Sequence, residues 1–103
     1  MRIWLDDVRP MPEGYDLWAK NIQDAWYALA NTMDKDLFVS FDHDLGQHYT
    51  GYDLAKMIEH DCFYGLFPYH IGWAIHSANP VGRKNIEQAM GNADKYWFQH
   101  SQE

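Results

Sequence analysis

The residues that follow one apolar run place the tightest limit on how this chain folds. The run LFVSF at residues 37–41 is apolar at almost every position, as is typical of a central strand in a parallel sheet. Asp42, His43 and Asp44 come directly after it. In an extended chain, residues 42 and 44 project to one side and residue 43 to the other. Two carboxylates roughly 4 Å apart repel by about 4 kcal/mol at an effective dielectric near 20. The cluster therefore needs a cation, a proton, a bound ligand or water at an open turn.

Short apolar strands alternate with amphipathic helices along the whole chain. Strands are predicted at residues 2–5, 15–19, 37–41 and 69–75. Helices are predicted after Asn21, after a capping box of Thr50 and Asp53, and after Asn79 with a proline in the first turn. This alternation implies a parallel sheet with right-handed crossovers. The expected buried stripes are Ile22, Ala25, Trp26, Leu29 and Met33, then Leu54, Met57, Ile58 and Cys62, then Ile86, Ala89, Met90, Ala93 and Trp97.

Size and charge restrict the class of protein. The 103 residues are enough for one domain with one modest core, which we place at residues 1–98 with a polar tail at 99–103. The formal net charge of −7 argues against binding to long nucleic acid, which needs a basic surface. It is compatible with a small anionic ligand held by a metal ion or by a helix end.

The cysteine content and the apolar runs bear on location. Cys62 is the single cysteine, so there is no intrachain disulfide, and a free thiol fits a reducing compartment. The first residues turn acidic too early for a signal peptide. No apolar run approaches the roughly 20 residues of a membrane span. We therefore expect a cytoplasmic protein without a membrane partner.

Polar side chains follow three of the four predicted strands. Asp6 and Asp7 come after the first strand, residues 42–44 after the third, and His76, Ser77 and Asn79 after the fourth. In open parallel α/β sheets, ligands bind outside the carboxyl ends of the strands, where the strand order reverses. Because these side chains come from three separate strands, we predict a functional site at this edge of the sheet.

Four sequence blocks resemble a known family. They are LDDVRP at residues 5–10, FDHDLG at 41–46, TGYD at 50–53 and HSANPVG at 76–82. The acidic pair, the aspartate after the third strand and the serine after the fourth resemble those of response-regulator receiver domains. The four blocks in this order look like the cyclic-phosphate processing receiver-like domains of bacteria and phages. The resemblance implies a truncated receiver or flavodoxin-like α/β domain with three layers. Its four-stranded parallel sheet would have the strand order 2-1-3-4.

The chain departs from an ordinary receiver domain at three places. A proline-rich loop at residues 8–14 stands where the first helix is expected. No fifth strand with a lysine follows the third helix, and histidines enter at positions 43 and 76. The missing lysine argues against a regulated phosphorylation switch at Asp42, although phosphoryl transfer to this carboxylate is chemically possible.

The resemblance implies a divalent metal, Mg²⁺ or else Mn²⁺, held by carboxylates. Asp6 and Asp42 are the first candidate ligands, and either Asp42 or Asp44 matches the receiver phosphoacceptor. Candidates for proton transfer are His43 and His76, because an unperturbed histidine has its pKa near working pH. The alternative is that a histidine only orients a carboxylate. The full candidate sets are Asp6, Asp7, Asp42 and Asp44 for the metal and His76, His43 and Asp42 for catalysis.

Phosphate oxygens are expected to bind at the start of the third helix. Its unpaired amides and positive dipole end attract anions, and Ser77, Asn79 and Arg83 lie beside them. Arg9 is a second candidate clamp. The alternatives are that Asn79 is only a helix cap and that Arg9 only pairs with the acidic residues before it.

Together with these residues, the resemblance implies metal-assisted hydrolysis of a cyclic phosphate, at a 2′,3′-cyclic RNA end or in a cyclic nucleotide. The expected partner is a small phosphorylated ligand or an RNA end. Two alternatives are a non-catalytic receiver-like signalling or ligand-binding module, and a phage-encoded inhibitor that binds a protein in the host cytoplasm.

Overall fold

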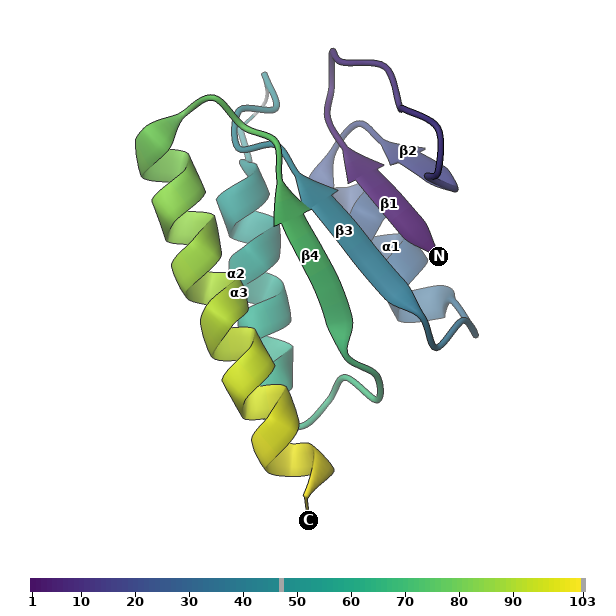
Figure 1. Ribbon diagram of the computed structural model, residues 1–103, viewed down its shortest axis with the longest axis vertical. Helices are drawn as coiled ribbons and strands as arrows, with labels where there is room; N and C mark the ends of the chain where they lie inside the picture. The colour runs from purple at the N-terminus through teal and green to yellow at the C-terminus, as the bar shows by residue number, and fades with distance from the viewer. Residues whose placement is uncertain (47, 103) are drawn as a thin grey trace.

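The computed structural model describes residues 1–46 and 48–102. The elements follow one another as β1 (Arg2–Leu5), β2 (Leu17–Ala19), α1 (Ile22–Asn31), β3 (Leu37–Phe41), α2 (Gly51–Phe63), β4 (Ile71–Ile75) and α3 (Pro80–Ser101) (Figure 1). All strand pairs are parallel, and the strand order is β2-β1-β3-β4. The predicted four-stranded parallel sheet and its strand order are therefore confirmed.

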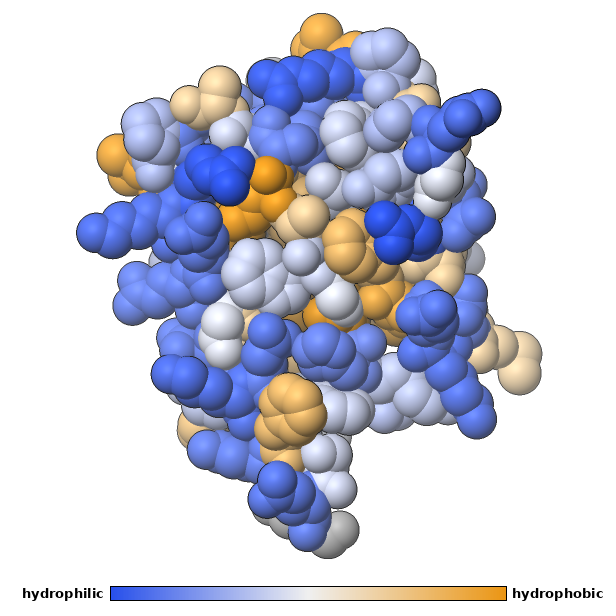
Figure 2. All heavy atoms as spheres, viewed as in Figure 1, coloured by the Kyte–Doolittle hydropathy of each residue, from blue (hydrophilic) through white to orange (hydrophobic). Residues whose placement is uncertain are grey.

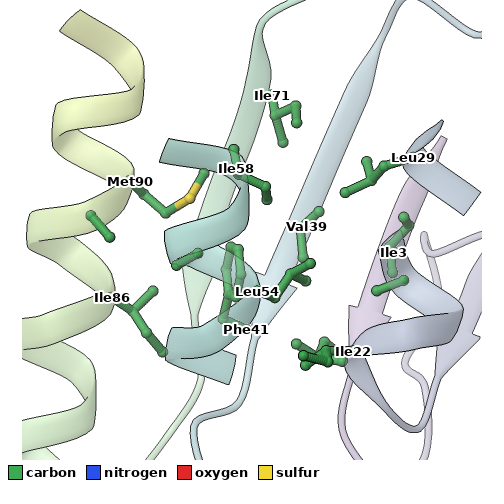
Figure 3. Packing of buried hydrophobic residues seen from close by; sticks show 14 of the residues in the cluster. Ile3, Ile22, Leu29, Val39, Phe41, Leu54, Ile58, Ile71, Ile86 and Met90 are labelled. Carbon is green, nitrogen blue, oxygen red and sulfur yellow. The ribbon is translucent and has the colours of Figure 1, made fainter. Parts of the chain in front are cut away.

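One face of the sheet carries the hydrophobic core. Side chains alternate along each strand, so Ile3 and Leu5 of β1 share a face with Val39 and Phe41 of β3. These four side chains are completely buried. The helices cover them with apolar residues, among them Ile22, Leu29, Leu54, Ile58, Ile86 and Met90 (Figure 3).

The helices lie on this face only (Figure 1). The connections from β2 to β3 and from β3 to β4 advance in the same direction across the sheet, so right-handed crossovers bring α1 and α2 to one side. The connection from β1 to β2 runs in the opposite direction, but residues 6–16 contain no helix. The loop predicted in place of the first helix is therefore confirmed, and it stands where a domain of three layers would have its third layer.

Aromatic and basic side chains cover part of the face without helices. Tyr15 of the loop packs edge-to-face on Trp4 at 5.2 Å between ring centroids. The guanidinium of Arg2 lies 5.0 Å from the ring of Tyr15 and 4.1 Å from that of Phe38. These contacts let a short loop shield the sheet where a helix is missing.

The predicted helix starts are confirmed. Asn21 accepts a hydrogen bond from the backbone of Asp24 at 2.7 Å, and Asn79 accepts one from Gly82 at 3.0 Å. At the start of α2, the carboxylate of Asp53 accepts hydrogen bonds from the backbone N–H of Thr50 at 2.7 Å and from its hydroxyl at 3.2 Å.

Some boundaries differ from the sequence prediction. β2 begins at Leu17 and β4 at Ile71, two residues later than expected in each case. Met33 was wrongly assigned to the buried stripe of the first helix, because α1 ends at Asn31 and leaves Met33 94% exposed. α3 continues through Ser101, into the segment expected to be a polar tail. Residue 103 of that tail lies outside the described residues.

Two remaining sequence expectations concern Cys62 and membrane spans. Cys62 is a buried free thiol, as its place on the inner face of α2 predicts. Within the described residues, none of the helices has the length and apolar character needed to cross a membrane.

The capping box of α2 is expected to stabilise the fold measurably. Replacing Asp53 with Ala removes the acceptor for both Thr50 donors and should lower the free energy of unfolding by about 1 kcal/mol, as for other helix caps. Urea denaturation measures the change. Glu13→Ala, in an exposed loop, is the matched control, and equal stabilities of the two variants would contradict this role of the box.

Candidate active site

Asp6, Asp42 and His76 meet at the carboxyl ends of β1, β3 and β4. The last residues of these strands pair with one another, Leu5 with Phe41 and Phe41 with Ile75. The pairing continues one residue further, since Asp42 N–H donates to the Leu5 carbonyl at 3.0 Å and His76 N–H to the Phe41 carbonyl at 2.9 Å. One ligand atom from each of Asp6, Asp42 and His76 lies within 4.8 Å of the others. We call these three residues the triad.

The carboxylate of Asp6 is held on both oxygens. Oδ1 accepts hydrogen bonds from the backbone N–H groups of Val8 and Arg9, both at 2.8 Å. Oδ2 lies 3.0 Å from Nε2 of His76. Burial raises the pKa of Asp6, but these hydrogen bonds outweigh burial and hold the pKa below the ordinary value. Asp6 is therefore an ionised carboxylate that is only 1% exposed.

The pKa of Asp42 is shifted in the opposite direction from that of Asp6. Burial, and after it the negative charge of Asp6, raise the pKa of Asp42 above the ordinary value. This side chain is 8% exposed, and its neighbours do not fully offset its charge. A cation in contact with both carboxylates would remove the repulsion between them.

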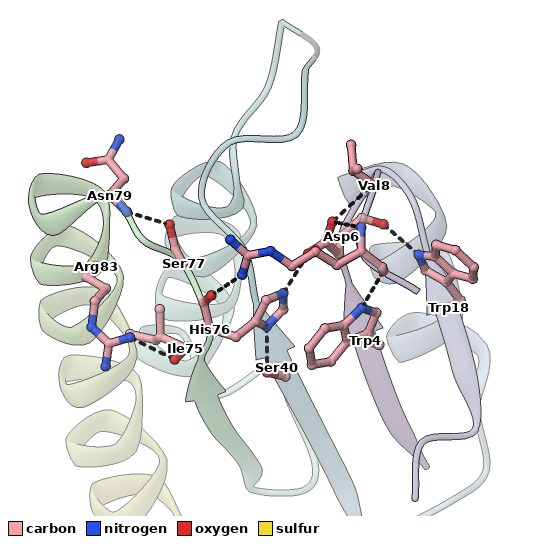
Figure 4. A network of polar contacts seen from close by, with 11 residues as sticks. Trp4, Asp6, Val8, Trp18, Ser40, Ile75, His76, Ser77, Asn79 and Arg83 are labelled. Carbon is pink, nitrogen blue, oxygen red and sulfur yellow. Dashed lines mark hydrogen bonds and ion pairs between the residues drawn. The ribbon is translucent and has the colours of Figure 1, made fainter. Parts of the chain in front are cut away.

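His76 is fixed on both ring nitrogens (Figure 4). Nδ1 lies 2.8 Å from the hydroxyl oxygen of Ser40, and Nε2 bonds to Asp6 as described. The ring stacks on Trp4 with centroids 3.7 Å apart and an interplanar angle of 7°. Burial lowers the pKa of His76, although the bond to Asp6 opposes this effect. The imidazole is therefore neutral near pH 7.

A second polar cluster is formed by His43, Asp44 and Asn79. Nδ1 of His43 lies 2.9 Å from Oδ1 of Asp44, and Nδ2 of Asn79 lies 3.4 Å from the same ring nitrogen. The hydrogen bond with His43 lowers the pKa of Asp44. In the part of the chain that the structure describes, Nε2 of His43 has no hydrogen-bond partner.

The chain turns at residue 43, and this turn separates the two carboxylates of the Asp-His-Asp sequence. His43 accepts a hydrogen bond from the backbone of Gly51 at 2.9 Å, and its ring lies against Gly82, where a Cβ would come 2.2 Å from the ring Cγ. The side chain of Asp44 is 67% exposed and bonds to His43, so Asp42 alone of the two joins the triad.

Asp7 lies outside the triad as well. Its carboxylate faces Gly46 in the loop that follows β3, and a Cβ at Gly46 would lie 2.6 Å from Oδ2 of Asp7. Gly46 also has a φ of +63°, which favours glycine. Of the four predicted metal ligands, the structure brings only Asp6 and Asp42 together.

The predicted phosphate-binding residues surround the end of β4. The hydroxyl of Ser77, which is 5% exposed, accepts a hydrogen bond from Asn79 N–H at 3.1 Å. Arg83 donates through Nη1 to the Ile75 carbonyl at 2.9 Å, and Arg9 through Nη1 to the His76 carbonyl at 2.6 Å (Figure 4). Each guanidinium has further N–H donors, so both arginines are anchored beside the site.

Comparison with known proteins identifies the family. The chain matches the cyclic-phosphate processing receiver domain over residues 1–92. It belongs to this family. Neither the curated proteins nor the solved structures gave a match. The family predicted from the four sequence blocks is thus confirmed, and its description associates these receiver domains with cyclic-phosphate processing.

Sequence reasoning missed two residues of the receiver site, Trp4 and Ser40. Each stands two positions before a triad carboxylate, Trp4 before Asp6 and Ser40 before Asp42. Because side chains of a strand repeat every two residues on one face, both lie on the same face as the triad. That periodicity is the signal from which they could have been predicted.

The triad has the chemistry of a divalent-cation site. Carboxylate oxygens are the ligands that Mg²⁺ and Mn²⁺ prefer. Two buried carboxylates supply such oxygens here, and burial, followed by the charge of Asp6, raises the pKa of Asp42. The described residues therefore fit the predicted Mg²⁺ or Mn²⁺.

Replacing Asp42 with Asn should stabilise the metal-free protein and remove its response to metal. Carboxylates about 5 Å apart repel by about 3 kcal/mol at a dielectric near 20, so we expect the free energy of unfolding to rise by about 1–2 kcal/mol. The folded-state pKa of Asp42 lies above the unfolded value of about 3.9. Its unfavourable contribution therefore grows as the pH rises above that value, and the gain is largest near pH 7.

Melting curves with and without Mg²⁺ or Mn²⁺ measure both effects, because a ligand that binds the folded state raises the melting temperature. Asp44→Asn is the matched control, since Asp44 lies outside the triad, and it should keep the metal response. An Asp42→Asn variant that still responds to metal would show that the cation binds elsewhere.

Proposed function

We propose that this receiver domain hydrolyses a cyclic phosphodiester with the help of a divalent cation. The substrate would be a 2′,3′-cyclic phosphate at an RNA end or a cyclic nucleotide. The observation that supports the proposal most directly is the neighbourhood of two clusters. Asp42 of the buried carboxylate pair is followed directly in the chain by His43 and Asp44, which form a histidine–carboxylate pair at the first turn of α3.

Asp6 and Asp42 would hold the cation. Asp6 is held by two backbone N–H donors and by its contact with Nε2 of His76, so its carboxylate is oriented before any ligand arrives. When bound, the cation supplies positive charge to the phosphate oxygens and lowers the pKa of bound water. The net charge of −7 repels an anionic substrate, so local positive charge at the site is needed.

The first turn of α3 would bind the phosphate. Its amides carry the positive end of the helix dipole, and the ring of His43 lies against Gly82 in that turn. Arg83 donates to the carbonyl of Ile75, the last residue of β4, and Arg9 to that of His76, which follows it. Each guanidinium has further N–H groups for phosphate oxygens, although Nη2 of Arg83 also lies 3.9 Å from Oε1 of Glu87.

His43 is the residue that we assign to proton transfer. Asp44 accepts the Nδ1 proton, and Nε2 then presents a lone pair with no partner among the described side chains. Nε2 takes a proton from water as the water oxygen bonds to phosphorus. The P–O bond of the ring breaks, and the leaving oxygen takes a proton from solvent. The product is the ring-opened monoester.

The geometry supports a different role for His76. Both of its nitrogens are bonded inside the protein, so it has no free atom for proton exchange with a substrate. The sequence offered both histidines for proton transfer, and the geometry favours His43. Without the turn at residue 43, His43 would point away from the phosphate.

Incubation with Mg²⁺ or Mn²⁺ and a panel of cyclic phosphates tests the function. The wild-type chain should release monoester, detected by chromatography. His43→Ala should lower kcat by about 10²–10⁴-fold, which is the usual contribution of a general base. Asp44→Asn should have a smaller effect in the same direction.

His60→Ala, at an exposed position of α2, is the control for loss of a histidine and should keep full activity. Absence of turnover with every substrate and metal would overturn the proposal. If calorimetry then detected phosphate binding without product, the chain would be a ligand-binding module. Asn79 accepts a hydrogen bond from Gly82, and Arg83 donates one to Ile75. These bonds hold both side chains in place for binding and do not require catalysis.

A further inference from the structure

Ser40, His76 and Asp6 form a continuous chain of hydrogen bonds across three strands. The hydroxyl oxygen of Ser40 lies 2.8 Å from Nδ1 of His76, and Nε2 of the same ring lies 3.0 Å from Oδ2 of Asp6. Ser40 is 2% exposed and Asp6 is 1% exposed. Both outer members of the chain are therefore shielded from water.

The donors and acceptors fix the direction of this chain. Asp6 Oδ1 already accepts two backbone N–H groups, and an ionised carboxylate can only accept hydrogen bonds. Nε2 of His76 must therefore carry the proton that points at Asp6. Among the described residues, Nδ1 is the one hydrogen-bond partner of the Ser40 hydroxyl. A buried hydroxyl needs an acceptor for its proton, so Ser40 donates to Nδ1, and Nδ1 carries no proton.

The imidazole ring is also prevented from turning. Trp4 stacks on it at 3.7 Å with nearly parallel planes. The backbone of His76 is held on both sides, since its N–H donates to Phe41 and its carbonyl accepts from Arg9. Rotation of the ring would break two hydrogen bonds and the stacking contact.

We infer that Ser40 is a positioning residue that keeps the proton of His76 on Nε2, so that His76 orients Asp6 and does not coordinate the cation. The cation then meets only oxygen ligands from the triad. This inference deepens the proposed function, because it assigns the ligand class of the same site. Oxygen ligands favour Mg²⁺ and Mn²⁺, whereas an imidazole nitrogen favours Zn²⁺ and Co²⁺.

The ring tautomer can be read directly by NMR. In wild-type protein with ¹⁵N-labelled histidine, we expect the signals of His76 to be those of a neutral ring protonated at Nε2. They should stay so when the diamagnetic ion Mg²⁺ is added. An imidazolium, a ring protonated at Nδ1, or direct coordination of the cation by Nε2 would overturn the inference.

Replacing Ser40 with Ala tests the role of the hydroxyl. We expect binding of Mn²⁺ to weaken by about 10–100-fold, which is the usual effect of removing a residue that orients a metal ligand. The affinity for Zn²⁺ relative to Mn²⁺ should rise, because Nε2 can then lose its proton to a metal. Isothermal titration calorimetry gives both constants, and Ser40→Thr, which keeps the hydroxyl, should restore the wild-type preference.

Ser77→Ala is the matched control, because Ser77 is a buried serine of the same sheet edge that bonds to Asn79 and not to His76. It should leave Mn²⁺ affinity unchanged. Equal metal affinities in Ser40→Ala and Ser77→Ala would overturn the inference, and the wild-type NMR result decides it if Ser40→Ala fails to fold. These measurements use no substrate. A lack of turnover would therefore contradict the proposed function but not the role assigned to Ser40 and His76.

Discussion

The register of three parallel strands is the constraint on which the site depends. Leu5, Phe41 and Ile75 stand in one row of the sheet, and the next residue of each strand is a member of the triad. A slip of one residue in β3 would turn Asp42 toward the core and Phe41 toward the opposite face. The buried side chains of Ile3, Val39 and Phe41 prevent this slip. The hydrophobic core therefore sets the geometry of the polar cluster.

The direction of the crossovers decides which face the triad occupies. The crossovers bring α1 and α2 to one side, and α3 packs against α2. The triad therefore lies toward the side that a helix does not cover. In the space-filling view of this side, hydrophilic residues surround a few apolar and aromatic ones (Figure 2). The loop that replaces a helix supplies the backbone donors of Val8 and Arg9 to Asp6. The loop that stands in place of a helix thus contributes direct hydrogen bonds to a carboxylate of the site.

Much of the fold could be predicted from the sequence, since local signals determine it. Asn21, Thr50 with Asp53, and Asn79 each act on a neighbouring helix turn, and their caps were recognised without knowledge of the tertiary structure. Met33 was misplaced because apolar periodicity continues past Asn31, whereas the helix does not. The position of the candidate site could also be predicted from local signals, because residues 6, 42 and 76 each follow an apolar run that forms a strand.

The division of labour within the site could not be predicted, because it depends on contacts between distant segments. Arg9 and Arg83 were predicted as phosphate clamps, but Arg9 donates to the carbonyl of His76, 67 residues away in the sequence, and Arg83 donates to that of Ile75, which lies 8 residues before it. Alternation along an extended strand placed Asp44 beside Asp42. The turn at residue 43, closed by Gly51 and packed on Gly82, sends Asp44 to His43 instead. Gly51 and Gly82 leave room for this close packing. His43 and Asp44 can therefore form a second cluster with Asn79, separate from Asp42.

The two histidines show how the same side chain gains opposite roles from its surroundings. His76 is neutral and enclosed by Trp4, Ser40 and Asp6, so it acts on a carboxylate and not on a ligand. His43 has a carboxylate on one nitrogen and, within residues 1–46 and 48–102, no hydrogen-bond partner on the other. An orienting group needs every polar atom satisfied, whereas a proton-transfer group needs one unsatisfied nitrogen near the reacting atoms. By this criterion, the proposed proton transfer would take place at the first turn of α3, and the buried triad would hold the cation.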